Sequence, residues 1–256
     1  MPDLGLALPP GARLVSLAER PDLRAALGDH NVSVWPEFML HSAVANRNWD
    51  LLFEIWPDDQ IVLLDADDRI LAAHNSAPLA WDGTDAGLPD GWEDQFEWSV
   101  AQRRDGIEPT TLGALQIVVG RDRQGSGLAG TMLAAMRANA RAHGLRAVIA
   151  CVRPTWKPRY PLTPIDRYAT WTRDDGLPFD PWIRLHVRLG GRIVRPSPRS
   201  MTITGTVAEW QSWTGMAFPE SGDYVVPGAC ESVRVDRQAD LGTYYDSNVW
   251  IVHALG

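Results

Sequence analysis

The chain has 256 residues, of which 45% are hydrophobic and 22% charged, a composition typical of an ordinary globular protein. Its formal net charge of −8 argues against non-specific binding to nucleic acid. No apolar run approaches the roughly 18 residues that a membrane-spanning helix needs. The first ten residues lack the basic start of a signal peptide. We therefore expect a cytoplasmic protein that binds neither nucleic acid nor membranes.

The N-terminal third predicts a strand, two helical stretches and a hairpin. Residues 12–18 alternate as a strand does, and residues 20–27 favour a short helix. Helical spacing continues over residues 36–55, with a break around Asn46 to Asn48. Strands at 60–65 and 69–74 flank a turn, and a helix is predicted at about 94–103.

A strand, a glycine turn, a helix and a second strand are predicted within residues 111–152. The strand at 112–119 is apolar and β-branched, and the turn after it contains Gly125 and Gly127. The helix has an apolar face formed by Leu128, Met132, Leu133, Met136 and Ala140. Gly144 is placed to end the helix before a strand at 145–152. The first N–H groups of a helix lack internal partners and carry about half a positive charge, so this turn can bind an anion.

The C-terminal part predicts further helices and strands. Residues 153–179 carry five prolines and several aromatic residues, which indicates an ordered lid; a structural insertion or an oligomer contact is the alternative. Asp180-Pro181 starts a helix that ends at Gly190-Gly191. Strands are predicted at 192–195, 201–205, 225–226, 232–235 and 248–253, with a helix at 206–214.

The turn sequence Gln124-Gly125-Ser126-Gly127-Leu128-Ala129 resembles the acyl-CoA-binding motif of the GNAT acetyltransferases, Gln/Arg-x-x-Gly-x-Gly/Ala, at every defining position. The turn has neither the lysine of a nucleotide-binding loop nor a dinucleotide fingerprint. The resemblance implies acetyl-CoA, or another acyl-CoA, as co-substrate. It also implies that residues 124–129 hold the CoA pyrophosphate and that Ile117, Val118 and Val119 line the pantetheine arm.

The same resemblance implies the fold. We expect an α/β (α+β) protein with a mixed, mostly antiparallel sheet, two parallel, splayed strands at its centre and helices on both faces. The chain should form one GNAT-like domain, 1–256, with an insertion at about 153–179 and an extended C-terminal region. A homodimer is possible. Neither the two cysteines nor the histidines show metal-ligand spacing, so no metal is expected.

Acetyl transfer requires a polarised thioester carbonyl and a place for the protons to go. The resemblance implies that an N–H near Val118 or Val119 polarises the carbonyl. Many GNAT members use a tyrosine four residues before the glycine that ends the helix after the fifth strand; here that position is His186. We predict His186 as the proton donor to the thiolate, with a surface histidine as the alternative. Tyr160 or Tyr168 could supply the proton instead.

The sequence gives the least information about which residue acts as the general base. Glu108 and Asp82 are candidates by chain order alone, and a base acting through ordered water would leave no trace in the sequence. Residues 78–109 are expected to form one wall of the acceptor pocket, and some of the twelve tryptophans should line it.

The predicted function is transfer of an acyl group, in the first place acetyl, from CoA to a primary amine of a small molecule by direct attack on the thioester. The alternatives are a thioester hydrolase or decarboxylase, a carrier-protein acyltransferase, and a non-catalytic CoA-binding module. The sequence does not identify the acceptor.

Overall fold

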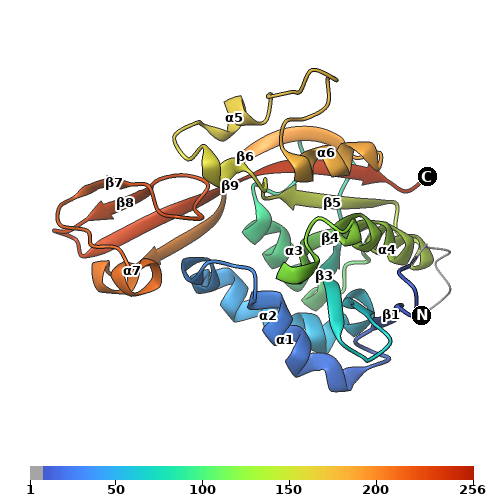
Figure 1. Cartoon of the computed structure of the whole chain (residues 1–256). Helices are drawn as coiled ribbons and strands as arrows, with labels where there is room; N and C mark the ends of the chain where they lie inside the picture. Colours follow the sequence, from blue (N-terminus) through green and yellow to red (C-terminus); the bar gives the residue numbers. More distant parts are fainter. Residues whose placement is uncertain (1–7) are drawn as a thin grey trace.

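A computed structural model, which describes residues 8–256, shows one mixed sheet in the order β1-β2-β3-β4-β5-β9-β8-β7, with β6 paired to β9 (Figure 1). Only β4 and β5 pair in parallel within the described residues, so the prediction of a mostly antiparallel mixed sheet is confirmed. The strands are β1 (Arg13–Ser16), β2 (Ile61–Leu64), β3 (Ile70–Leu79), β4 (Thr111–Val119), β5 (Ala147–Val152), β6 (Arg192–Gly205), β7 (Gly222–Tyr224), β8 (Val233–Asp236) and β9 (Leu241–Ala254). The expectation of no signal peptide concerns residues that lie mostly outside the described range.

Helices cover both faces of the sheet, as expected. In Figure 1, α4 lies to the right of β3 and β4, and α2 and α3 lie to their left. One face carries α1 (Arg24–Val32), α2 (Ala43–Ile55) and α3 (Trp92–Arg104); the other carries α4 (Leu128–Ala142), the short α5 (Ile165–Tyr168) and α6 (Pro181–Arg188). The predicted apolar face of α4 is buried throughout. None of the helices in the described part of the chain is long and apolar enough to cross a membrane.

The helical break predicted around Asn46 to Asn48 is wrong. The chain breaks earlier, between the 3₁₀ turn η2 (Glu37–His41) and α2. Ser42 is the N-cap of α2, where its hydroxyl accepts the N–H of Ala45 at 3.1 Å. A capped helix tolerates a few polar residues. Helix α2 therefore continues without interruption through the residues where a break was predicted.

The two strands predicted at 192–195 and 201–205 are one strand, β6, which pairs with β9 from Arg192↔Val252 to Gly205↔Gly242. The strand β9 begins at Leu241, well before the predicted start at 248, and the strand expected at 225–226 is replaced by β7. The paired strands extend with β7, β8 and α7 (Val207–Thr214) to the left of Figure 1. This extension packs on η2, where the rings of His41 and Trp213 stack with centroids 4.1 Å apart.

The parallel strands β4 and β5 separate in the middle of the sheet. They pair only from Thr111↔Ala147 to Ala114↔Ala150, although both strands continue. The register between β3 and β4 skips Leu115, which marks a β-bulge at the same level. A gap therefore opens between β4 and β5 beyond Ala114.

Candidate active site

A cavity of about 450 Å³ passes through this gap. Its middle is formed by residues 114–117 of β4, residues 150–152 of β5 and Arg153 just beyond β5. On the α4 side it is lined by Leu133, Met136, Trp182 and His186, and on the opposite side by Asn31, Trp35, Met39, Trp49, Trp92 and Met201. Because side chains from both faces of the sheet line one space, two molecules that approach from opposite faces can meet in the gap.

The glycine turn lies on the α4 side and is open. Gly125 and Gly127 have φ of +80° and +87°, a region that residues with a side chain rarely adopt. A Cβ built on either glycine would meet no atom within 4 Å. The N–H groups of Gly127, Leu128 and Ala129 have no acceptor among the described residues. The turn thus has the free amides and the space that a phosphate needs, and its assignment to the CoA pyrophosphate stays a prediction.

The edge of β4 that faces the gap carries unpaired backbone groups. The N–H of Gly120 donates to Leu71 O in β3 at 3.1 Å, and Val118 stands opposite Ala73. Since amides alternate along a strand, the N–H of Val118 points to β3, and those of Ile117 and Val119 point to the gap. Of the two positions expected near the carbonyl, this alternation favours Val119, together with Ile117.

Helix α3 holds the bulge in β4 open. Trp92 Nε1 donates to Leu115 O at 2.7 Å, and Gln95 Nε2 donates to Ala114 O at 3.0 Å. Two successive carbonyl groups of β4 at the bulge therefore accept hydrogen bonds from side chains of α3. This part of 78–109 does form a wall of the cavity, through Trp92.

A chain of buried amides fixes the wall next to the bulge. Trp35 Nε1 donates to Gln116 Oε1 at 3.1 Å, Gln116 Nε2 donates to Asn75 Oδ1 at 2.9 Å, and Asn75 Nδ2 donates to Gln60 Oε1 at 3.0 Å. Sequence reasoning missed Gln116. The signal was a single polar residue inside the apolar run 112–119.

His186 lies in the cavity wall and is only 1% exposed, so the surface-histidine alternative is wrong. Its Nδ1 is 2.9 Å from Nε2 of His253 in β9, and its own Nε2 has no partner in the described part of the chain. Burial, reinforced by His253, lowers the pKa of His186 to about 3. Burial likewise lowers the pKa of His253 to about 4. Both rings are neutral at pH 7, and the role of His186 in proton transfer stays a prediction.

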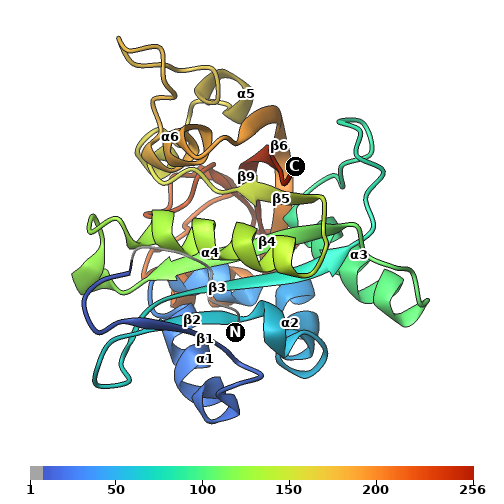
Figure 2. The same ribbon diagram turned by 90° about the vertical axis from the view of Figure 1, so that its right-hand side faces the viewer.

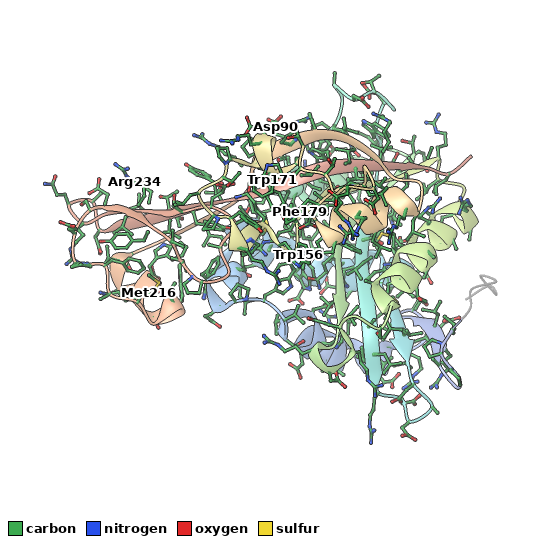
Figure 3. All side chains as sticks on the ribbon, turned by 45° about the horizontal axis from the view of Figure 1, so that its top comes forward. Asp90, Trp156, Trp171, Phe179, Met216 and Arg234 are labelled. Atoms are coloured by element: carbon green, nitrogen blue, oxygen red, sulfur yellow. The ribbon has the colours of Figure 1, made fainter. Side chains whose placement is uncertain are left out.

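The structure does not bring Tyr160 and Tyr168 to the cavity. Both belong to an aromatic cluster in residues 153–179, where Figure 3 shows Trp156, Trp171 and Phe179 close together. The Tyr168 hydroxyl donates to Asp180 Oδ2 at 2.9 Å, and Asp180 Oδ1 caps α6. Burial raises the pKa of Tyr168, which opposes a role as an acid. Figure 2 shows this segment at the top of the view, above β5 and α6.

Glu108 and Asp82 lie away from the cavity as well. Both are exposed, and they flank the end of the sheet where Leu79 of β3 pairs with Thr111 of β4. Asp82 Oδ1 accepts the N–H of Thr84 at 2.8 Å, as in a polar turn. The gap between β4 and β5 opens at the other end of β4. The prediction that these two carboxylates lie near the reacting groups rested on chain order alone.

Known proteins are similar to this chain in sequence and in fold. The chain matches no protein-family model. It is 33% identical to the arginine N-acetyltransferase avaD of Aspergillus versicolor, over 98% of this chain and 97% of that protein. Its fold is similar to the loading GNATL domain of CurA from Lyngbya majuscula, with a TM-score of 0.59 and 17% identity over 95% of this chain and 98% of that one. The GphF GNAT-like decarboxylase in complex with isobutyryl-CoA gives a TM-score of 0.57 and 20% identity over 96% and 99%.

The chain therefore belongs to the GNAT superfamily of acyl-CoA-dependent N-acetyltransferases. It is an N-acyltransferase with an acyl-CoA as its co-substrate.

Proposed function

We propose that the protein transfers an acetyl group from acetyl-CoA to a primary amine of a small cationic molecule, with arginine as the first candidate acceptor. The observation that carries this proposal is the cavity that crosses the sheet between β4 and β5. A full-length relative with arginine N-acetyltransferase as its name supports the choice of acceptor.

In this proposal the two substrates enter from opposite faces. CoA lies along α4 with its pyrophosphate on residues 124–129, and its thioester reaches the gap, where one of the two outward amides, that of Val119 or that of Ile117, can donate to the carbonyl oxygen. The acceptor enters between α1 and α2 and attacks the carbonyl carbon. The ammonium first loses one proton to solvent or to a base. The N–C bond then forms and the C–S bond breaks, the nitrogen loses a second proton, and the departing thiolate takes up one proton.

His186 is on the CoA side of the gap, which suits contact with the departing sulfur. If His253 donates to its Nδ1, the neutral ring of His186 carries its hydrogen on Nε2, which has no other partner among the described residues. A neutral N–H stabilises a thiolate by a hydrogen bond without storing a proton beforehand. We therefore assign His186 this contact in the proposed reaction.

The acceptor side suits a cation. Trp35, Trp49 and Trp92 contribute rings to this wall, and Trp49 stacks on Trp92 with centroids 6.4 Å apart. Indole faces attract cationic groups. Asp50 adds a carboxylate to the lining.

Thiol release from acetyl-CoA, with mass spectrometry of the products, tests the proposal. Arginine, agmatine, lysine, tryptamine and a reaction without acceptor form the panel. We expect release that depends on arginine, with a product heavier by one acetyl group. Release of thiol without any acceptor would indicate a hydrolase. Release of carbon dioxide from malonyl-CoA would indicate a decarboxylase. Binding of CoA without acetylation of any acceptor would indicate a non-catalytic module.

A further inference from the structure

The guanidinium of Arg153 forms part of the cavity wall just beyond the end of β5. Its Nε lies 3.0 and 3.1 Å from the two carboxylate oxygens of Asp246, and its Nη2 donates to Gly228 O at 2.7 Å. Its Nη1 donates to no residue within 8–256. An arginine side chain always carries its charge in proteins, so one N–H-bearing corner of a fixed cation is left for a ligand.

Asp246 holds this cation and is not itself available to a ligand. Its side chain is fully buried, and besides Arg153 it accepts the hydroxyl of Tyr244. That hydroxyl in turn accepts the N–H of Cys230 at 2.8 Å. The arginine is thus fixed from behind by a carboxylate in β9, which orients its remaining N–H bonds.

Arg153 belongs to the acceptor side of the cavity. Side chains alternate along β5, and Ala150 and Val152 pack on the α6 side while Cys151 joins the core under α1 to α3. Arg153 therefore points to the face opposite the glycine turn. Its Cζ lies 5.8 Å from the ring centroid of Trp35, the residue that donates to Gln116 next to the bulge. This position separates Arg153 from the phosphates of CoA.

Asn31 of α1 supplies a second, independent observation. It lines the same cavity and is 2% exposed, yet neither its Nδ2 nor its Oδ1 has a partner among the described residues. A buried amide without partners costs free energy, and a ligand with polar groups would satisfy it. It lies near the end of α1, four residues before Trp35, and both residues line the cavity together with Arg153.

We propose that Arg153 binds the carboxylate of an α-amino acid acceptor, with Asn31 as a further polar contact, so that the enzyme selects free amino acids over the corresponding decarboxylated amines. The proposal rests on the proposed acetyl transfer. A planar guanidinium matches a carboxylate better than any other side chain does, and the contact is charge-assisted. Asp246 balances the charge of Arg153, and the carboxylate of the acceptor is balanced by the acceptor's own ammonium.

The wild-type enzyme gives the first test. We expect kcat/KM for arginine to exceed that for agmatine and for argininamide by about 100-fold, because one or two charge-assisted contacts are lost in each analogue. Equal values for arginine and agmatine would overturn the proposal while leaving acetyl transfer intact.

Variants give the second test. Arg153→Met should reduce kcat/KM for arginine about 100-fold more than it reduces kcat/KM for agmatine, since agmatine has no carboxylate. Arg159→Met, which removes an exposed arginine stacked on Trp156 outside the cavity, is the control and should change neither. Arg153→Met leaves the buried carboxylate of Asp246 without its partner. The double variant Arg153→Met with Asp246→Asn, which removes both charges, is therefore measured alongside. Asn31→Ala tests the second contact with the ion pair intact.

If no acceptor is acetylated, the proposed function fails, and calorimetry with arginine on the CoA complex then tests the inference by itself. Binding of arginine that is lost in the double variant supports a carboxylate site at Arg153. Absence of arginine binding, or binding that survives in the folded double variant, overturns it.

Discussion

The surroundings of His186 decide which role this residue can have in the reaction. Counting from Gly190 placed it at a proton donor's position, but the sequence could not show that it is buried against His253, 67 residues away. Burial makes the neutral ring the stable form, which favours hydrogen bonding over storage of a proton. The interaction with His253 engages Nδ1 and leaves Nε2 without a partner among the described residues.

We expect His186→Gln to lower the single-turnover rate of acetyl transfer by about 100-fold, the lower end of what the loss of one positioned donor to a developing negative charge costs. The affinity for acetyl-CoA should change little, since the glycine turn is untouched. His253→Gln should have a smaller effect, because it acts only by orienting His186. Rapid-quench kinetics measure both variants, and an unchanged rate in folded His186→Gln would remove His186 from the chemistry.

At the scale of the element, the turn before α4 and the bulge in β4 together define where a thioester can lie. The turn depends on local chemistry, since both of its glycines adopt positive φ. The bulge depends on partners from α3, so it has no local signature in β4.

Gly127→Val should weaken the binding of acetyl-CoA by about 100-fold or more, because a branched side chain would occupy the open space in front of the amides and remove about two charge-assisted contacts. Calorimetry measures the affinity, and circular dichroism checks the fold. Gly144→Val is the matched control: Gly144 also has a positive φ, +71°, and open space around its Cβ position, but it follows the opposite end of α4. If both variants bind CoA like the parent protein, the turn is not the phosphate site.

At the scale of the whole molecule, three buried histidines on three elements make stability depend on pH. His74 in β3, His186 in α6 and His253 in β9 are each at most 1% exposed. Burial lowers the pKa of His74 to about 3. The unfolded chain binds protons to these rings near pH 6.5, whereas the folded chain does not, so folding stability is present above that pH and is lost as the pH falls.

For His74 alone, acidification from pH 7.5 to pH 5 should reduce the free energy of unfolding by about 2 kcal/mol. His74→Leu should remove that part of the pH dependence, as measured by urea unfolding at both values. His143→Gln is the contrasting control, since a hydrogen bond to Asp59 raises the pKa of His143 and gives it the opposite sign. A His74→Leu variant whose stability falls as steeply as that of the parent would contradict the prediction.

The sequence by itself determined the elements whose signals are local. The strand at 112–119, the turn with Gly125 and Gly127 and the apolar face of α4 could all be predicted, because glycine chemistry and helical periodicity act between residues close in the chain. From these the family, the mixed sheet and the acyl-CoA co-substrate could be predicted.

Only the tertiary structure decided the rest of the candidate site. The ion pair of Arg153 with Asp246 and the contact of His186 with His253 join residues that are far apart in the sequence. The burial of the Asn31 amide without a partner among the described residues likewise depends on how distant segments pack. The positions of Glu108 and Asp82 also depend on the tertiary structure. Chain order suggested that they lie near the reacting groups, but in the structure they flank the end of β4 that is opposite to the gap. Burial and charge pairing depend on which strands become neighbours, and that choice is made by the packing of the whole sheet.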